Sequence, residues 1–223
     1  MGPVERLGLI GDVHAEDELL ATALAFLRGQ DLEVIACTGD LADGPGSVGR
    51  CRRLLQDHGV LTVAGNHDRW LLANRMRQLP DATSRGRLDG ETRRYLNALP
   101  RTVELPTRHG TALLCHGLGE DDMAAVGPDD YGYAIEQNWE LQELLGDRRY
   151  RFVLNGHTHH RMVRHFDDLT IINGGTLKRD HEPGFVIVDF GSGEADLLDI
   201  DPDGRVTYAL RTALTGGPSL PGR

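Results

Sequence analysis

Residues 7–14 read LGLIGDVH, a short apolar run that ends just before Asp12. The same plan returns in EVIACTGD (residues 33–40) and in VLTVAGNHD (residues 60–68). Asp40 follows Asp12 by 28 positions, and Asn66 follows Asp40 by 26. Each step is close to the roughly 30 residues of one β-α-β unit. Because parallel strands need such crossovers, the spacing predicts a parallel sheet and an α/β fold.

The rest of the chain continues this alternation. Residues 16–28 and 47–57 have the spacing of amphipathic helices. Residues 68–99 and 134–145 are expected to be mainly helical. Further strands are expected at 101–105, 111–115, 150–154, 162–166, 169–172, 184–190, 195–199 and 205–210. We expect residues 1–212 to form one domain and residues 213–223 to form a loose C-terminal tail.

Two more fragments follow strand-like runs: Cys115-His116-Gly117 and Gly156-His157-Thr158-His159. In open α/β sheets, sites form outside the carboxyl ends of the strands. The five fragments together supply carboxylates, imidazoles and an amide oxygen at such ends. Mixed imidazole and carboxylate ligands suit Mn, Fe, Co, Ni or Zn better than Mg or Ca. The sequence therefore predicts a transition-metal site.

In this order, the fragments resemble the pattern of the calcineurin-like metallophosphoesterase superfamily: D-x-H, G-D, G-N-H-[DE], H and G-H-x-H. All are present between residues 12 and 159, about two thirds of the chain. Within the superfamily, the chain looks most like the small single-domain bacterial phosphodiesterases. The resemblance implies two packed mixed β-sheets flanked by helices, a four-layer αββα sandwich. It also implies a hydrolase that attacks a phosphate ester in line with a hydroxide bridging two metal ions.

The resemblance further implies roles for individual residues. One metal would be held by Asp12, His14, Asp40 and His159, and the second by Asp40, Asn66, His116 and His157, so that Asp40 bridges them. His67 would face the leaving-group oxygen, and Asp68 would orient His67. The cofactors would be two divalent transition-metal ions, Mn²⁺ first, with Fe, Zn, Ni or Co as alternatives.

Composition limits the classes of partner and the cellular compartments that we expect for this protein. The formal net charge is −10, which disfavours a nucleic-acid partner, although arginines gather in residues 75–94. The three cysteines form no C-x-x-C pair, as is common in a reducing compartment. The chain has no apolar run of the roughly 20 residues that cross a bilayer, and its first residues do not resemble a signal peptide. We expect a cytoplasmic enzyme that acts on a small phosphoester and has no membrane partner; the sequence does not fix its oligomeric state.

Several alternatives remain open on sequence alone. The protein phosphatases of the superfamily extend the second fragment to G-D-x-x-D-R-G; here Asp43 is present, but Gly44 follows it. A phosphomonoesterase, a dinucleoside polyphosphate hydrolase and a nuclease are the other enzyme classes. A non-catalytic binding scaffold of the same fold is the alternative outside enzymes, and it predicts gaps in the ligand set.

A few residues near the motifs have two readings each. Arg69 either contacts substrate phosphate or forms a surface ion pair. Lys178 and Arg179 follow a Gly-rich turn that either shapes the pocket or is a plain hairpin loop.

His160 is expected to point away from the metals, as a strand neighbour of His159. The acidic loop 117–132 is expected to be a lid that disfavours highly anionic substrates.

Overall fold

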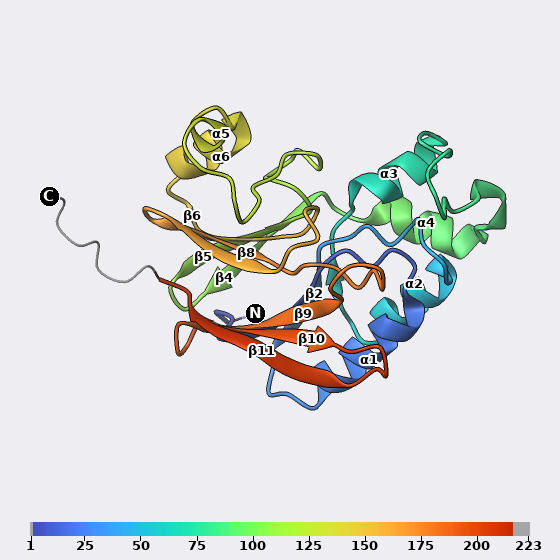
Figure 1. The fold of residues 1–223 in the computed structure, drawn as a ribbon, viewed down its shortest axis with the longest axis horizontal. Helices are drawn as coiled ribbons and strands as arrows, with labels where there is room; N and C mark the ends of the chain where they lie inside the picture. The colour runs from blue at the N-terminus through green and yellow to red at the C-terminus, as the bar shows by residue number, and fades with distance from the viewer. Residues whose placement is uncertain (1, 216–223) are drawn as a thin grey trace, which may run out of the picture.

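The computed structural model describes residues 2–215 and contains two β-sheets with helices on their outer sides (Figure 1). The strands are β1 (Arg6–Ile10), β2 (Val34–Cys37), β3 (Leu61–Thr62), β4 (Thr102–Thr107), β5 (Gly110–Cys115), β6 (Tyr150–Asn155), β7 (Met162–Phe166), β8 (Leu169–Asn173), β9 (Gly184–Asp189), β10 (Glu194–Ile200) and β11 (Val206–Ala213). The helices are α1 (Asp17–Arg28), α2 (Val48–Asp57), α3 (Asn66–Ala73), the 3-10 turn η1 (Arg85–Arg87), α4 (Gly90–Ala98), α5 (Tyr133–Glu136) and α6 (Trp139–Gly146). None of the helices within residues 2–215 has both the length and the apolar sequence that crossing a membrane requires.

The six-stranded sheet has the order β11-β10-β9-β1-β2-β3. Its strands β1, β2 and β3 are parallel, with α1 and α2 as the crossovers between them. The predicted β-α-β units are therefore confirmed. Strand β9 pairs antiparallel with β1 on its other side, which makes the sheet mixed.

The five-stranded sheet has the order β4-β5-β6-β8-β7. Its central strands β5, β6 and β8 are parallel, and β4 and β7 pair antiparallel at its two edges. Parallel strands direct their carboxyl ends to one edge of a sheet, so the residues that follow β5 and β6 lie side by side.

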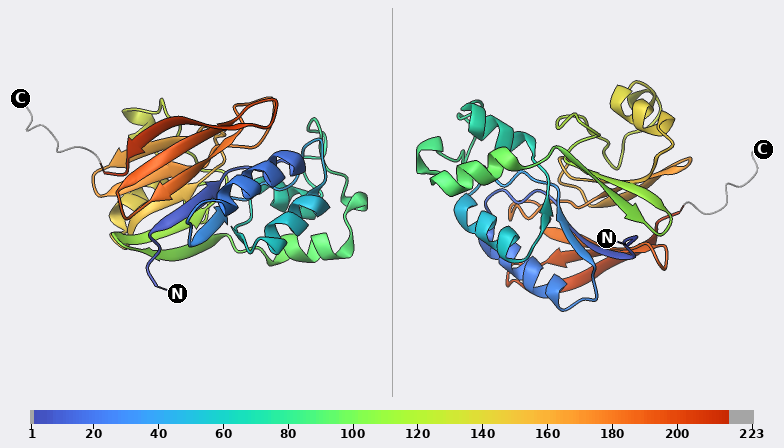
Figure 2. Two further views of the ribbon diagram at one scale, coloured as in Figure 1. Left: turned by 90° about the horizontal axis from the view of Figure 1, so that it is seen from below. Right: turned by 180° about the vertical axis from the view of Figure 1, so that it is seen from behind.

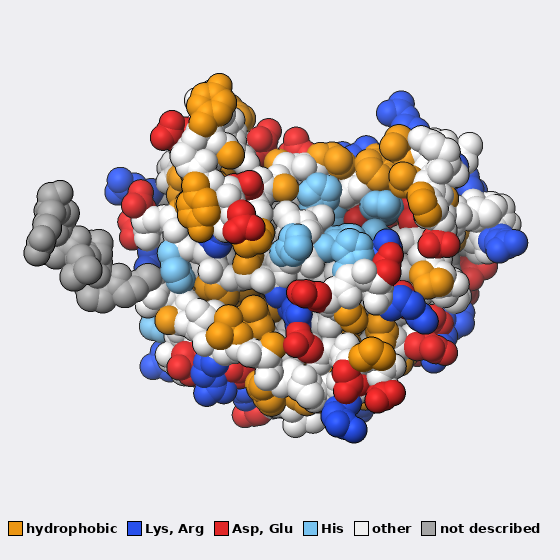
Figure 3. All heavy atoms as spheres, in the orientation of Figure 1, with side chains coloured by type: hydrophobic (Ala, Val, Ile, Leu, Met, Phe, Trp, Pro, Cys, Tyr) orange, Lys and Arg blue, Asp and Glu red, His pale blue; other side chains and the backbone are white. Residues whose placement is uncertain are grey.

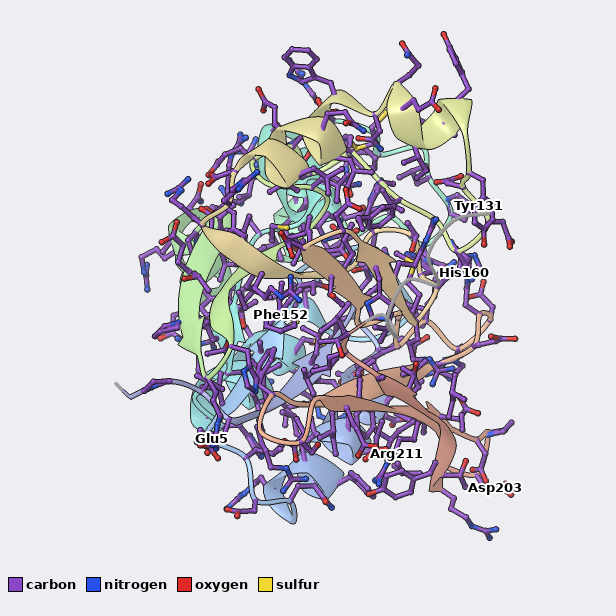
Figure 4. The ribbon with its side chains drawn as sticks, turned by 90° about the vertical axis from the view of Figure 1, so that its left-hand side faces the viewer. Glu5, Tyr131, Phe152, His160, Asp203 and Arg211 are labelled. Atoms are coloured by element: carbon purple, nitrogen blue, oxygen red, sulfur yellow. The ribbon has the colours of Figure 1, made fainter. Side chains whose placement is uncertain are left out.

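Alternation along the strands divides the apolar side chains among three cores. Leu7 and Leu9 of β1 face the space between the two sheets, where Phe152 of β6 meets them; Figure 4 shows Phe152 in this interior. Ile10 faces the core under α1 and α2. On the outer side of the five-stranded sheet, Leu113 packs in the core that contains α6. The four-layer αββα arrangement implied by the resemblance is therefore confirmed, and Figure 2 shows it from two further sides.

The expectation of a mainly helical stretch over residues 68–99 is wrong in its middle. Helix α3 ends at Ala73 because Asn74 takes the left-handed conformation, with φ of 54°, which Asn tolerates better than most residues. Residues 74–84 then form an irregular segment without helix. Helix α4 starts only after Asp89, whose side chain accepts a hydrogen bond from Thr92 N.

Three further boundaries differ from expectation. Strand β3 is only Leu61–Thr62, instead of 60–64, because its pairing with β2 covers two residues. The expected helix 134–145 is split, since Asn138 caps a separate helix α6. The loose tail was expected from residue 213, yet Ala213 lies in β11 and Leu214 is buried. The rest of that expected tail, residues 216–223, lies outside the described residues, and the extent of the domain stays a prediction.

Candidate metal centre

The side chains expected to bind metal come from the carboxyl ends of strands in both sheets. Asp12 and His14 follow β1, Asp40 follows β2, and Asn66 begins α3 just after β3. The remaining three are His116 after β5 and His157 and His159 after β6. Figure 3 shows histidine side chains gathered in a hollow between two lobes of the surface. The structure thus brings together residues that lie up to 147 positions apart in the sequence.

One set of donors consists of Asp12, His14 and His159, whose ligand atoms lie within 4.8 Å of one another. The Nε2 atoms of His14 and His159 are 3.0 Å apart. His159 Nε2 is 3.3 Å from an Asp12 carboxylate oxygen, and His14 Nε2 is 3.9 Å from Asp40 Oδ2. The residues implied for the first metal therefore converge on one point.

A second set consists of Asp12, Asp40 and His116, again within 4.8 Å. His116 Nε2 lies 3.4 Å from Asp40 Oδ2 and 2.8 Å from Asn66 Oδ1. The two sets share Asp12, and Asp40 lies close to donors of both. Side chains in such a position can bridge two cations.

Backbone carbonyls fix how the imidazoles are presented. His14 Nδ1 lies 3.0 Å from Asp43 O, and His116 Nδ1 lies 2.8 Å from Thr38 O. A carbonyl can only accept, so each Nδ1 donates its hydrogen and each neutral ring keeps a lone pair on Nε2. Those lone pairs point at the other donors of the two sets. The Nε2 atoms of His14 and His159 lie 3.0 Å apart, and a cation between them would bind both when neither atom carries a hydrogen.

His157 is the least direct member of the predicted ligand set. Its ring centroid lies 5.2 Å from that of His116, but His157 is in neither donor set. Its backbone N–H donates to the Asp12 carboxylate at 2.9 and 3.1 Å. The structure therefore places His157 beside the second set and shows that its backbone orients Asp12.

The loops that carry these donors depend on unusual backbone geometry. His14, Asp40, His157 and His159 all have positive φ, between 45° and 69°. Asp and His enter this left-handed region more readily than most residues. Gly156 has a different reason to be small: a Cβ there would collide with Asp12 Oδ1 and Thr38 Oγ1. The turn after β6 therefore packs directly on the first ligand.

The site contains two buried carboxylates, whose charges shift the pKa values of neighbouring groups. Asp12 and Asp40 are 0% and 1% exposed. Burial, together with the charge of Asp40, raises the pKa of Asp12 to about 7, although His116 opposes the shift. Burial alone would lower the pKa of His116, but the charges of Asp40 and Asp12 outweigh it and raise that pKa to about 10. Burial would also raise the pKa of Asp40, but the positive charges of His116 and His14 outweigh burial and lower that pKa. Asp40 therefore stays a carboxylate among positively charged neighbours, an environment that a metal cation can also supply.

His67 lies next to both sets and has its own carboxylate. Its Nδ1 is 2.8 Å from Asp43 Oδ2, and its ring packs edge-on against His14 with centroids 4.8 Å apart. Asp43 is 4% exposed and also accepts bonds from Arg77 at 2.7 and 2.9 Å and from Thr83 N at 2.8 Å. The sequence offered one signal for Asp43, its position three residues after Asp40, and none for Arg77.

The expectation that Asp68 orients His67 is wrong. Asp68 is fully buried, and its carboxylate accepts hydrogen bonds from the backbone N–H groups of Leu41, Ala42 and Gly65 at 2.9, 3.2 and 3.1 Å. Asp68 therefore links two segments: the turn that contains Asp40 and the start of α3. In this helix, side chains one position apart diverge by about 100°, so Asp68 points inward while His67 faces the site.

Two loops border the hollow. Arg69 of α3 forms a bidentate ion pair with Asp122 of the loop 117–132. Its Nε and one terminal guanidinium nitrogen each lie 2.6 Å from an Asp122 carboxylate oxygen. Of the two readings of Arg69, the ion pair is the one that the structure shows. The Gly-rich turn after β8 passes beside Asp12, because Thr176 Oγ1 donates to Asp12 O at 2.9 Å. Further along it, the ring of His181 packs against His159 at 4.8 Å, whereas His160 is exposed.

Comparison with known proteins gives the same assignment. Residues 6–193 match the family described as the calcineurin-like phosphoesterase superfamily domain. An uncharacterized protein of Methanocaldococcus jannaschii is 20% identical over 188 residues, which cover 81% of this chain and 73% of that protein.

Two solved structures illustrate the shared fold. A phosphoesterase from E. coli has a TM-score of 0.58 at 14% identity, covering 94% of this chain and 100% of the other. An archaeal phosphodiesterase has a TM-score of 0.55 at 16% identity, covering 92% and 99%. Since the family match spans most of the chain and the donors of its motifs meet in one hollow, this protein belongs to the calcineurin-like phosphoesterase superfamily and is a phosphoester hydrolase.

Proposed function

We propose that this protein hydrolyses phosphodiesters with the help of two divalent transition-metal ions. The observation that carries the proposal is the pair of donor sets, Asp12–His14–His159 and Asp12–Asp40–His116, which share a buried carboxylate. Asn66 and His157 complete the second set in this proposal. Nitrogen and oxygen donors in this mixture fit Mn²⁺ first, and also Fe, Zn, Ni or Co.

Two cations in these sets would activate a water molecule and neutralise charge on the phosphoryl oxygens. The chain's own part is to fix the donors before substrate arrives. The carbonyls of Asp43 and Thr38 hold the His14 and His116 rings, and the backbone of His157 holds Asp12. Rigid donors lose little entropy on binding, which favours both affinity and positioning.

His67 is the residue that we assign to the leaving group. Its ring borders the donor sets, since its ligand atom lies within 4.8 Å of those of His14 and Asp40. Asp43 engages its Nδ1, so its Nε2 is free to give a proton to the departing oxygen. A water oxygen forms the new P–O bond and releases one proton to solvent, the bond to the alcohol oxygen breaks, and the alcohol leaves with the proton from His67, which is later replaced from solvent. Asp68 takes no part in this step and acts through the shape of the Asp40 turn.

The choice of a diester over a monoester rests on charge. A phosphomonoester dianion meets the acidic loop 117–132 with one more negative charge than a diester does. Burial and His116 lower the pKa of His157, and the charge of Asp122 in this loop opposes that shift, so Asp122 acts electrostatically on the site. A monoesterase remains the second candidate, because Asp43 beside His67 matches the G-D-x-x-D part of the protein-phosphatase pattern. The scaffold alternative predicted gaps in the ligand set, and every position of that set carries a donor.

The test is hydrolysis of bis-p-nitrophenyl phosphate beside p-nitrophenyl phosphate. The protein is stripped with a chelator and reloaded with Mn²⁺, and metal content is measured in parallel. Asp40→Asn keeps the shape of the side chain but removes a buried charge that lies close to donors of both sets. We expect diester turnover that depends on metal and falls by at least about 100-fold in Asp40→Asn.

Each outcome has a distinct meaning. Turnover of the monoester alone moves the protein to the phosphatases. Turnover that survives in Asp40→Asn removes this site from the mechanism. If the protein binds its full complement of Mn²⁺, Co²⁺, Ni²⁺ or Zn²⁺ but hydrolyses neither ester, the non-catalytic binding scaffold becomes the better assignment.

A further inference from the structure

A second hollow adjoins the metal centre. It has a volume of about 650 Å³ and lies between the start of α1, the loop 179–183 and the turn 200–204 that joins β10 to β11. His181 lines this hollow, which we call the α1 pocket, and the same ring packs against His159 with centroids 4.8 Å apart. The contact between the His181 and His159 rings therefore separates the α1 pocket from the predicted first metal site.

A residue of the α1 pocket and a residue of the loop after β6 lie on the same side of the molecule. Figure 4 shows Asp203, which lines the pocket, on the side that also carries His160, the neighbour of His159. A group bound at the metal centre on the side of His159 therefore lies near His181, which lines the pocket. His67, by contrast, lies against Trp70 and Asp43, which are not part of the pocket lining.

Apolar side chains form much of the lining. Leu19 of α1, Pro183 and Ile200 contribute to it, and Ile200 belongs to the core below, with 3% exposure. A surface of this kind gains free energy by covering carbon atoms of a ligand. It gives little to a ligand that is only a compact anion.

The charges around the pocket are mostly negative. Arg179 is already engaged, because Glu16, which is 1% exposed, holds its guanidinium at 2.6 and 2.9 Å. That pair leaves Glu18, Asp201 and Asp203 in the lining. Asp201 accepts backbone hydrogen bonds within its own turn, while Glu18 and Asp203 are exposed. Like charges placed together are unfavourable, so a second phosphate or a carboxylate is disfavoured here.

From these observations we propose that the α1 pocket binds the alcohol group that stays on phosphorus, and that it selects alcohols carrying carbon surface and no negative charge. This inference rests on the phosphoesterase function proposed above. It places small diesters of neutral or cationic alcohols ahead of dinucleoside polyphosphates as substrates, because the latter would bring further phosphates to the pocket.

The test keeps the leaving group constant and varies the retained alcohol. The substrates are p-nitrophenyl diesters whose second alcohol is methanol, propanol, choline or 3-hydroxypropanoate. With the Mn²⁺-loaded wild-type protein, we expect kcat/KM for the propyl and choline diesters to exceed that for the hydroxypropanoate diester by about tenfold or more. The methyl diester reports the basal reaction, since its retained group is too short to fill the pocket.

Two variants assign the preference to the pocket. Glu18→Gln with Asp203→Asn removes the two exposed charges and is expected to bring the hydroxypropanoate diester to within about threefold of the propyl diester. Thr22→Trp fills the pocket from α1 and is expected to lower kcat/KM for the propyl and choline diesters about tenfold while leaving the methyl diester unchanged. The matched control is Asp31→Asn with Asp57→Asn, which removes two exposed charges elsewhere and should change nothing.

The outcomes separate the two proposals. If the wild-type protein cleaves the methyl diester but treats all four alcohols alike, the pocket inference is wrong and the enzyme assignment stands. The same conclusion follows if the control variant shifts the preference as much as the pocket variant does. If no diester is cleaved although metal is bound, the proposed function fails first.

Discussion

Asp43 connects the predicted catalytic histidine to the irregular segment 74–84. Its carboxylate accepts from His67 Nδ1, from Arg77 and from Thr83 N, and it is almost fully buried. We predict that Asp43→Asn lowers kcat by about 10- to 100-fold with a smaller change in KM, because the ring of His67 loses the charge that orients it. The measurement is steady-state turnover of the metal-loaded variant.

The leaving group supplies the control for this prediction. A nitrophenol leaves with little help from an acid, whereas an alkyl alcohol needs the proton. The Asp43→Asn loss should therefore be larger for a dialkyl or alkyl–phenyl phosphate than for bis-p-nitrophenyl phosphate. Equal losses for both would show that Asp43 acts through the fold and not through His67.

Asp68 illustrates a different use of a buried carboxylate. Its carboxylate accepts hydrogen bonds from three backbone N–H groups, for which residues 2–215 offer no second acceptor. We predict that Asp68→Ala lowers the free energy of unfolding by about 3 kcal/mol or more, because each buried donor left unsatisfied costs about 1–3 kcal/mol. Urea denaturation of the metal-free protein measures this. A change below about 1 kcal/mol would show that water replaces the carboxylate and that Asp68 does not fasten the turn.

At the scale of elements, the loop 117–132 is joined to α3 by Arg69 and Asp122. The pair is partly exposed, so its net contribution to stability is small, about 0–1 kcal/mol. We predict that Asp122→Asn leaves the melting temperature nearly unchanged but lowers KM for a monoester dianion about tenfold relative to a diester. The variant removes one negative charge and frees Arg69 to meet the phosphate.

The control for the loop is Asp129→Asn, which removes the same charge from an exposed position of the same segment. It should leave the ratio of the two KM values as it is in the wild type. If both variants change the ratio equally, the loop acts through its overall charge. If neither changes it, the loop is not a lid that senses charge.

The elements also show what the sequence could and could not reveal. The sequence predicts the strand ends because LGLI, EVIAC and YRFVL are mainly apolar runs that stop one or two residues before Gly11, Gly39 and Gly156, and buried parallel strands have that composition. The break after Ala73 is not predicted: Asn74 can end a helix in the left-handed conformation, but the residues after it, RMRQL, are common in helices and hide the stop. The family resemblance implies Asp68 as the partner of His67, whereas in the structure Asp43 arrives from another loop and contacts His67 Nδ1. Such contacts depend on tertiary packing, and no local pattern encodes them.

At the scale of the whole molecule, the folded chain holds Asp12 and Asp40 in its interior with Asp68 nearby. Charges of one sign confined in this way oppose folding unless a cation joins them. We predict that saturating Mn²⁺ raises the melting temperature by about 8–16 °C over the chelated protein, since 1,000-fold excess over Kd adds about 4 kcal/mol. Calorimetry on the same sample before and after chelation measures it. Asp40→Asn should show a smaller rise, and an unchanged melting temperature across metals would contradict the site.

The left-handed backbone at four of the ligand positions limits which substitutions the site can accept during evolution. Asn shares with Asp the ability to adopt that conformation, whereas β-branched residues do not. A descendant could therefore exchange Asp40 for Asn, and so weaken its metal, with the loop still folded as before. Exchange for Val or Ile would instead disturb both sheets, because the loops rest on each other. Loss of catalysis in this architecture thus has a short mutational route that preserves the fold, and a lineage that took it would keep the hollow as a ready-made binding surface.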